Sequence, residues 1–497
     1  MSNTYEMFLT ITREIGQLEA TAALLDWDSE TYMPKGGLSI RAEQQSLLAR
    51  LWHERQTDPK LGELLSKLDG KAEDEVAATN IREMRRNHKR AVKIPLKLVE
   101  QIARVSTVAK DAWVKAREAS AFDKFAPHLQ ELLDLKRQVA DAIGYERERY
   151  DALLDEYEPG ATTEDLKTLF ESLRTPLAKF VGELNEAERK PDPSILDRRF
   201  PVETQKLWCR QSAEGIGFSF ESGRIDVSAH PFCSGTGPSD VRLTTRYQEN
   251  FFPSAVFGTL HEAGHGLYEQ GLPLEHVFTP RGQAISLGIH ESQSRLWENM
   301  VGRSRAYWER YYPQCQTVFP EALEGVSLDE FYGAVNTVRP SLVRVEADEV
   351  TYNLHIILRF EIERDLIEQR VAVNDVPEAW NAKMKELLGI TPSNDAEGCL
   401  QDIHWSMGSF GYFPTYALGN LYAAQFYAAA ERAMPDLAEQ IRRGEFGALL
   451  DWMRTNIHHH GQRYRANELI RNVTGTPLSI EPFMSYIRRK FSPIYKI

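Results

Sequence analysis

The sequence predicts an all-α, mostly helical protein with one small antiparallel β-sheet, and three observations support this fold class. Charged residues alternate with Leu, Ala and Ile at three- and four-residue spacing over most of the 497 residues. A single stretch, 217–247, instead alternates polar and apolar residues around glycines. Turn signals are spread along the chain, and we find no repeat or long linker between them.

The helical segments begin early in the chain and are clearest at 77–92, 94–116 and 165–189. Turns between helices are expected at 34–37, 159–160, 191–193 and at Gly461, where proline and glycine interrupt the helical pattern. Strands are expected at 217–227 and 240–247. They lie immediately before residues 261–265, so the sheet should form one wall of a site built there. The connecting segment 230–238 either covers a cleft or simply joins the strands.

The helix after the strands carries the most informative motif, His261-Glu262-Ala263-Gly264-His265. Pro253-Ser254 favours its start, and Gly271 followed by Pro273 favours its end. Residues four apart lie on one helix face, so both imidazoles can reach one tetrahedral metal ion. Glu262 can then take a proton from metal-bound water without being a ligand. An apolar stripe would bury the other face: Val256, Leu260, Ala263 and Leu267.

A third ligand is needed, and Glu291 in His290-Glu291-Ser292-Gln293 is the natural candidate. Tyr268 and Gly271 stand where a metzincin continuation would need glycine and histidine, so that type of site is excluded. Two alternatives stay open at this point. Glu291 could merely pair with Arg295 one turn along, and Glu275 or Glu298 could be the ligand instead.

The amino-acid composition limits which binding partners and which cellular compartment are expected. Acidic residues outnumber basic ones by 72 to 59, a formal charge of -13, and no long basic run is present, so nucleic acid is not an expected partner. We see no secretory signal and no run of 18 apolar residues, which favours a soluble, cytoplasmic protein without a membrane partner. The four cysteines form no CxxC pair, as expected for reduced thiols.

Together, these motifs and several others resemble the carboxypeptidase Taq family of metallocarboxypeptidases over essentially the whole chain. The resemblance begins at Leu25-Asp26-Trp27-Asp28 and continues, in the expected order, through further motifs besides the two already given: His230-Pro231-Phe232, Asp240-Val241-Arg242-Leu243-Thr244, Val343-Arg344-Val345-Glu346-Ala347-Asp348 and Gly398-Cys399-Leu400-Gln401-Asp402-Ile403-His404-Trp405.

The resemblance implies a single metallocarboxypeptidase domain, 1–497, with a deep cleft between two helical lobes, similar in shape to neurolysin and angiotensin-converting enzyme. It implies a homodimer that releases single C-terminal amino acids from peptides with broad side-chain tolerance, using one divalent metal, zinc or cobalt. A dipeptidyl-carboxypeptidase or oligo-endopeptidase on the same scaffold stays open, as does a non-catalytic, metal-containing peptide-binding protein.

The remaining candidates support the reaction. For the oxyanion we expect His404 and a tyrosine of 412–416, Tyr416 by analogy with neurolysin-like enzymes, although this aromatic run could instead be core packing. Arg344 is the candidate for binding the substrate carboxylate, unless it forms an internal salt bridge to Glu346 or Asp348.

An acid–arginine pair and a run of three histidines also lead to predictions. Asp240 and Arg242 are expected behind the metal ligands, with Asp240 accepting a hydrogen bond from a ligand histidine. The run His458-His459-His460 resembles a metal tract, but adjacent helix positions point in different directions, so we interpret it as a partly exposed polar helix end.

Overall fold

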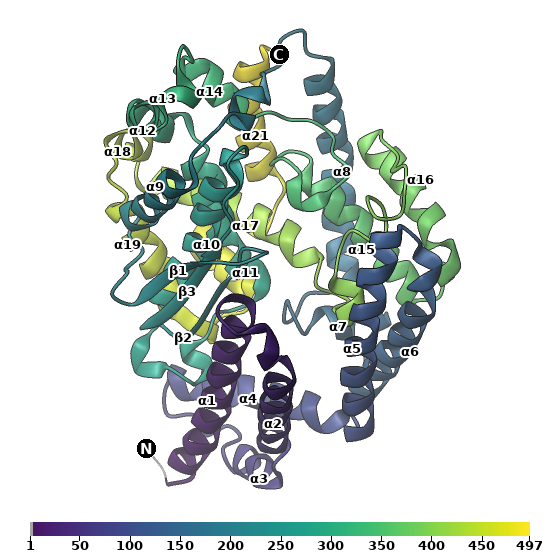
Figure 1. Ribbon diagram of the computed structural model, residues 1–497. Helices are drawn as coiled ribbons and strands as arrows, with labels where there is room; N and C mark the ends of the chain where they lie inside the picture. The colour runs from purple at the N-terminus through teal and green to yellow at the C-terminus, as the bar shows by residue number, and fades with distance from the viewer. Residues whose placement is uncertain (1–2) are drawn as a thin grey trace.

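The computed structural model describes residues 3–497 and is mostly helical, as predicted (Figure 1). Among the described residues, no helix is both long enough and apolar enough to span a bilayer. The first four helices form a unit at the bottom of Figure 1, and α1 packs along α2 there. They have a small apolar core of their own, which includes Phe8, Leu61 and Ile81. Their bounds are α1 (Asn3–Thr31), α2 (Leu38–Gln56), α3 (Pro59–Lys67) and α4 (Glu75–Lys93).

Five helices follow before the sheet. The predicted turns at 159–160 and 191–193 both lie between helices, on either side of α8. The bounds are α5 (Leu96–Ala119), α6 (Ala126–Ile143), α7 (Arg149–Leu154), α8 (Thr163–Glu186) and α9 (Val202–Gly215).

The sheet has three strands, β1 (Gly223–Val227), β2 (Cys233–Gly237) and β3 (Asp240–Thr245), in the order β1-β3-β2. The predicted small sheet is confirmed, but its two predicted strands, β1 and β3, pair in parallel instead of antiparallel. The antiparallel pair is that of β3 with β2, a strand in the predicted connection 230–238. The reason is the extra strand in the predicted connection. Because β2 reverses the chain between β1 and β3, those two strands run in the same direction and can lie side by side.

Helices after the sheet build the site. The sheet packs against α10, and α10 packs against α11. A π-helical turn, Leu296–Gly302, extends α11. The bounds are α10 (Phe252–Gly271), α11 (Leu287–Arg295), α12 (Arg305–Val318), α13 (Pro320–Leu323) and α14 (Leu328–Val335).

The C-terminal third is again helical, and its central element is α17, which packs along α11. Two short 3₁₀ turns, Arg344–Glu346 and His404–Met407, lie in the connections and carry candidate residues. The helix bounds are α15 (Tyr352–Ile367), α16 (Val376–Leu388), α17 (Pro414–Ala433), α18 (Leu437–Arg443), α19 (Gly447–Asn456), α20 (Ala466–Thr474) and α21 (Glu481–Tyr495).

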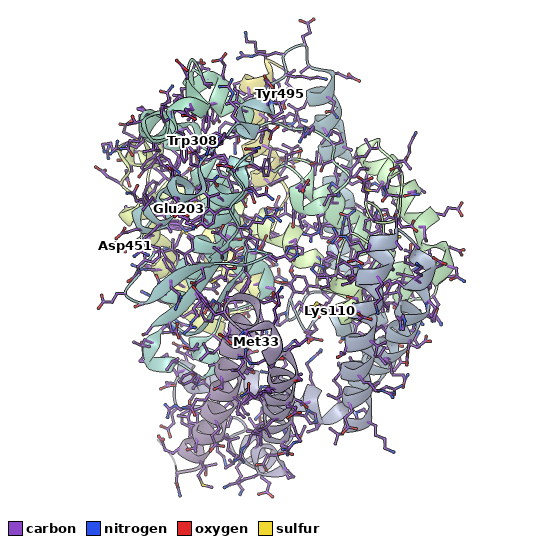
Figure 2. All side chains as sticks on the ribbon, viewed as in Figure 1. Met33, Lys110, Glu203, Trp308, Asp451 and Tyr495 are labelled. Carbon is purple, nitrogen blue, oxygen red and sulfur yellow. The ribbon has the colours of Figure 1, made fainter. Side chains whose placement is uncertain are left out.

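Figure 1 shows two groups of helices, one around the sheet and α12, the other around α5, α6 and α16. Figure 2 labels Trp308 on α12 in the first group and Lys110 on α5 in the second. The main apolar core runs through both groups, from Leu98 to Tyr495. The likeness to neurolysin and angiotensin-converting enzyme, with a deep cleft between two lobes, stays a prediction.

Candidate metal centre and active site

Helix α10 displays the two histidines of the motif because its other face is buried. The predicted apolar stripe of Val256, Leu260, Ala263 and Leu267 is fully buried. The helix starts with Pro253 in its first turn and ends at Gly271, as its sequence indicated. This packing fixes the helix axis, so His261 and His265 project from one face one turn apart.

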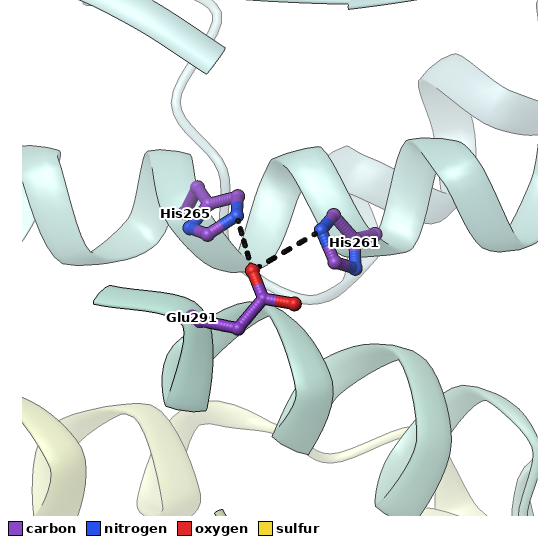
Figure 3. Close-up of side chains that lie close together, drawn as sticks. All are labelled: His261, His265 and Glu291. Carbon is purple, nitrogen blue, oxygen red and sulfur yellow. Dashed lines mark ion pairs between the residues drawn. The ribbon is translucent and has the colours of Figure 1, made fainter. Parts of the chain in front are cut away.

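The three predicted ligands converge (Figure 3). Glu291 Oε2 lies 3.3 Å from His265 Nε2 and 3.7 Å from His261 Nε2. Ligand atoms of the three residues all lie within 4.8 Å of one another. A tetrahedral ion with bonds near 2.05 Å separates its ligand atoms by about 3.3 Å. Both measured separations are close to this value, so the residues fit a divalent ion with two nitrogen ligands and one oxygen ligand.

The two carboxylate oxygens of Glu291 face different groups, which bears on the alternatives for the third ligand. Its Oε1 accepts a 2.6 Å hydrogen bond from Arg295 Nε, so the predicted alternative pairing exists, but it leaves Oε2 for the histidines. Glu275 is exposed and lies outside the cluster. Glu298 contacts His261 at Nδ1, the ring nitrogen that does not face Glu291.

Each ligand histidine has a partner at its second ring nitrogen. His261 Nδ1 lies 2.9 Å from Glu298 Oε2, and Arg295 and Arg303 both form ion pairs with Glu298. His265 Nδ1 lies 2.6 Å from Nδ1 of His290. These partners fix the ring orientations, as in many metal sites. Apart from Glu298, which was considered as a ligand, the sequence analysis did not assign them a role.

The prediction that Asp240 supports a ligand histidine is therefore wrong. Its carboxylate accepts two hydrogen bonds from Arg242, at 2.8 and 2.9 Å. The Arg242 guanidinium in turn lies 4.3 Å from the ring centroid of Trp27, so it links β3 to α1. Strand alternation explains the pairing, because residues 240 and 242 are two apart and share one face of the sheet.

Glu262 is buried next to the cluster and lacks a partner. Within residues 3–497 no side chain or backbone group forms a hydrogen bond or an ion pair with it. Burial raises the pKa of this carboxyl to about 7, and the charges of Glu291 and Glu298 also raise it. A carboxylate that is both unpaired and poised near neutral pH suits a general base.

The two oxyanion candidates lie side by side. His404 Nε2 is 3.3 Å from the hydroxyl of Tyr416. Burial lowers the pKa of His404 to about 3, so its imidazole is neutral. Burial raises the pKa of Tyr412 and of Tyr416, and the charge of Glu291 contributes to both shifts, so both phenols stay protonated near the metal centre. The rings of these tyrosines have centroids 5.3 Å apart.

Arg344 is buried and is held by Asp402, a partner not expected for it from the sequence. Its Nε and Nη2 donate to Asp402 Oδ1 at 3.0 and 2.8 Å. Glu346 is exposed, and Asp348 accepts from backbone N–H groups of its own turn, so neither forms the expected salt bridge. Asp402 also binds Arg359 at 2.6 Å, which leaves two buried guanidiniums for one carboxylate.

The cluster around Asp402 is joined to the metal centre. The third nitrogen of the Arg344 guanidinium donates to the hydroxyl of Tyr352 at 2.8 Å. The ring of Tyr352 has its centroid 4.3 Å from the guanidinium of Arg295, which holds Glu291. One continuous polar network therefore connects the candidate carboxylate-binding group with the third metal ligand.

The other histidines named from the sequence lie outside the cluster. His230 is exposed on the connection between β1 and β2. His458 is fully buried and lies 3.0 Å from the side-chain oxygen of Gln293, so the expectation of a partly exposed tract is wrong for this residue. His459 is exposed, as expected. Within residues 3–497, His261, His265 and Glu291 form the one group of three or more His, Cys, Asp or Glu side chains close enough to share a metal ion.

Comparison with known proteins agrees with this centre. The model of one protein family, carboxypeptidase Taq (M32) metallopeptidase, matches residues 7–491. The chain belongs to this family. It is 46% identical to thermostable carboxypeptidase 1 of Thermus thermophilus over 99% of both chains, and 38% identical to carboxypeptidase 1 of Bacillus subtilis, again over 99% of both.

A solved structure shows the same fold. The M32 carboxypeptidase of Deinococcus radiodurans superimposes with a TM-score of 0.95, at 39% identity and with 100% of each chain covered. The protein is therefore a metal-dependent carboxypeptidase of the M32 family.

Proposed function

We propose that this M32 carboxypeptidase removes single amino acids from the C-termini of peptides, with broad side-chain tolerance, at a centre formed by His261, His265 and Glu291. The observation that carries the proposal is the convergence of their three ligand atoms beside the unpaired carboxylate of Glu262. When bound, a divalent ion supplies a Lewis acid for the scissile carbonyl and lowers the pKa of water.

The protein groups divide the proton transfers between them. Glu262 accepts the proton of the attacking water and passes it to the departing amine, for which a carboxyl with a pKa near 7 is well matched. His404 and Tyr416 donate hydrogen bonds to the oxyanion. Their contact at 3.3 Å places both donors together, and neither is ionised at neutral pH.

Arg344 would bind the terminal carboxylate of the substrate. Burial of two guanidiniums with the single carboxylate of Asp402 leaves one positive charge uncompensated. A second carboxylate, that of the substrate, would neutralise it, and the planar guanidinium suits a bidentate pair. The contacts through Tyr352 and Arg295, which connect this charge with Glu291, support the proposal.

Four further parts of the proposal concern the working enzyme. We propose zinc as the metal, with cobalt as the alternative, because two imidazoles and a carboxylate suit both ions. Residues 1–497 act as one catalytic domain, in line with the core that joins the two helix groups. The enzyme is a homodimer. It works in the cytoplasm, and its four free cysteines fit a reducing compartment.

Product analysis tests the reaction type. An N-acylated dipeptide should yield one free amino acid, and a longer peptide should lose residues one at a time. The same peptides with a C-terminal amide should resist cleavage, because they lack the group that Arg344 binds. Release of dipeptides would support the dipeptidyl-carboxypeptidase, and internal cleavage of amidated peptides would support the endopeptidase.

A further inference from the structure

Two side chains behind His265 form a chain of hydrogen bonds that leads away from the metal centre. His265 Nδ1 lies 2.6 Å from His290 Nδ1, and His290 Nε2 lies 2.7 Å from Glu269 Oε1. Glu269 comes from α10, one turn beyond His265, and His290 comes from α11, next to Glu291. The chain thus ties the two ligand-bearing helices together at the ligands themselves.

The order of acceptors in this chain fixes the position of each proton. A carboxylate only accepts, so His290 donates its Nε2–H to Glu269. A metal ligand must offer the lone pair of Nε2, so His265 as a ligand carries its proton on Nδ1 and donates it to Nδ1 of His290. This tautomer leaves the lone pair of His265 on Nε2, the nitrogen that faces Glu291 Oε2 at 3.3 Å. The opposite order would direct an N–H at the place of the metal.

We propose that His290 and Glu269 are positioning residues, which hold His265 in the tautomer and ring orientation that a metal ligand needs. The inference rests on the proposed metal site. Packing supports it, because the rings of His265 and His290 lie with centroids 4.6 Å apart and 30° between their planes. Tyr268 packs against the outer side of His290, and its hydroxyl is fixed by the backbone N–H of Ile285.

The other ligand histidine is supported differently. His261 faces a single carboxylate, Glu298, which two arginines hold in place. His265 depends on the ring of His290 and on Glu269, whose side chain is 29% exposed and is hydrogen-bonded to His290. Substitution of Glu269 therefore disturbs few other contacts, which makes it a clean probe of the chain.

Zinc affinity of the purified full-length enzyme, measured by competition with a chromophoric chelator, tests the proposal. His290→Phe keeps a ring but removes both nitrogens, and we expect the zinc dissociation constant to rise by about 10- to 100-fold. Glu269→Ala should raise it by about tenfold. Glu269→Gln should have a smaller effect than Glu269→Ala, because the amide oxygen still accepts from His290. This graded rescue would not arise from packing alone.

Controls separate the inference from the site on which it rests. His459→Phe, at an exposed histidine, should bind zinc as the wild type does. His265→Ala should lose zinc, and if it does not, the proposed metal site itself is wrong. If His265→Ala loses zinc while His290→Phe and Glu269→Ala bind it normally, the positioning role is overturned. Should His290→Phe fail to fold, the two Glu269 variants decide the question.

Discussion

Glu262 is chemically distinct from the other carboxylates of the centre because it alone lacks a partner. Glu291 and Glu298 both contact arginines, and their pKa values fall below the ordinary range because those charges and the histidines outweigh burial. Burial raises the pKa of Glu262 to about 7, because burial and the charges of Glu291 and Glu298 outweigh the lowering effect of the nearby histidines. The three acids stand close together, yet their surroundings shift their pKa values in opposite directions, as the proposed roles of ligand, supporting acid and base require.

Glu262→Gln tests this division directly. The amide is nearly isosteric and cannot accept a proton, so we expect kcat to fall by about 10²- to 10⁴-fold. Zinc content should be unchanged, because Glu262 is not part of the ligand cluster. Metal analysis and hydrolysis of an N-acylated dipeptide provide the two measurements. Cleavage at the wild-type rate would falsify the assignment of Glu262 as the general base.

Arg344→Ala tests carboxylate recognition. Loss of a bidentate, charge-assisted pair should weaken binding of a free-acid dipeptide by about 10- to 100-fold, whereas the matching amide should bind about as it does to the wild type. Asp402 keeps its ion pair with Arg359 in the variant, so the buried carboxylate does not become unpaired. Inhibition constants for the two ligands give the comparison, with Arg344→Lys as the charge-conserving control. Equal weakening of both ligands would rule out the carboxylate role.

A residue's role could be predicted from the sequence when its partners lie close to it along the chain. Two histidines four apart define a shared face without any tertiary information, so His261 and His265 followed from helix geometry. Asp402 could not be assigned in this way, because it meets Arg344 only through the packing of distant turns. The support of His265 by His290 also depends on how α10 and α11 cross.

At the scale of elements, small residues let the helices of the site approach one another closely. A Cβ on Gly264, inside the histidine motif, would lie 2.7 Å from the backbone oxygen of Gln293 on α11. A Cβ on Gly419 of α17 would lie 2.4 Å from Cγ of Glu291. Helix α11 is therefore packed closely against both α10 and α17, and the contact with α17 restricts the rotamers of Glu291.

Gly419→Ala should displace Glu291 and so weaken the metal site. We expect a raised zinc dissociation constant and a loss of roughly 1–3 kcal/mol in stability from overpacking. Gly182→Ala is a matched control, because Gly182 also lies inside a helix, α8, but no atom lies within 4 Å of its added Cβ. This control should be stabilised by about 0.5–1 kcal/mol with unchanged zinc affinity. Equal zinc affinity in both variants would show that Glu291 is not confined by α17.

The sheet shows where element-level prediction reached its limit. Alternation of polar and apolar residues predicted strands before α10. The order of the strands in the sheet depends instead on which strands pair with one another, and the alternation pattern does not contain this information. The segment 230–238, predicted as a connection, contains β2, whose residues Ser234, Gly235 and Gly237 carry little alternation signal. β2 lies between β1 and β3 in the sequence but at the edge of the sheet. Because it reverses the chain, β1 and β3 run in the same direction, and this explains the parallel pair.

At the scale of the whole molecule, Glu158 joins parts of the chain that are far apart in sequence. Its buried carboxylate follows α7 and accepts hydrogen bonds from Ser286 Oγ and from the backbone N–H of Gly288, at the start of α11. It also accepts from the hydroxyl of Tyr422 on α17. Three hydrogen bonds partly offset its burial, yet burial still raises the pKa of Glu158 to about 7 from 4.5.

This shift makes the stability of the fold depend on pH in a defined direction. The folded protein holds the proton of Glu158 more tightly than the unfolded chain does, so the contribution of Glu158 to stability is complete below pH 4.5 and is lost as pH rises through about 7. A shift of this size corresponds to roughly 3 kcal/mol. Glu158→Gln removes the titration, and its amide can donate to Ser286 and Tyr422, whose hydroxyls can reverse.

We therefore expect the melting temperature of Glu158→Gln, relative to that of the wild type, to rise between pH 5 and pH 7.5 and then to level off. Other buried acids such as Glu363 titrate in both proteins, so the difference between the two profiles isolates Glu158. Glu346→Gln, at an exposed carboxylate, is the control and should follow the wild type. Parallel profiles for Glu158→Gln and the wild type would mean that Glu158 is ionised in the fold throughout, with its three donors outweighing burial.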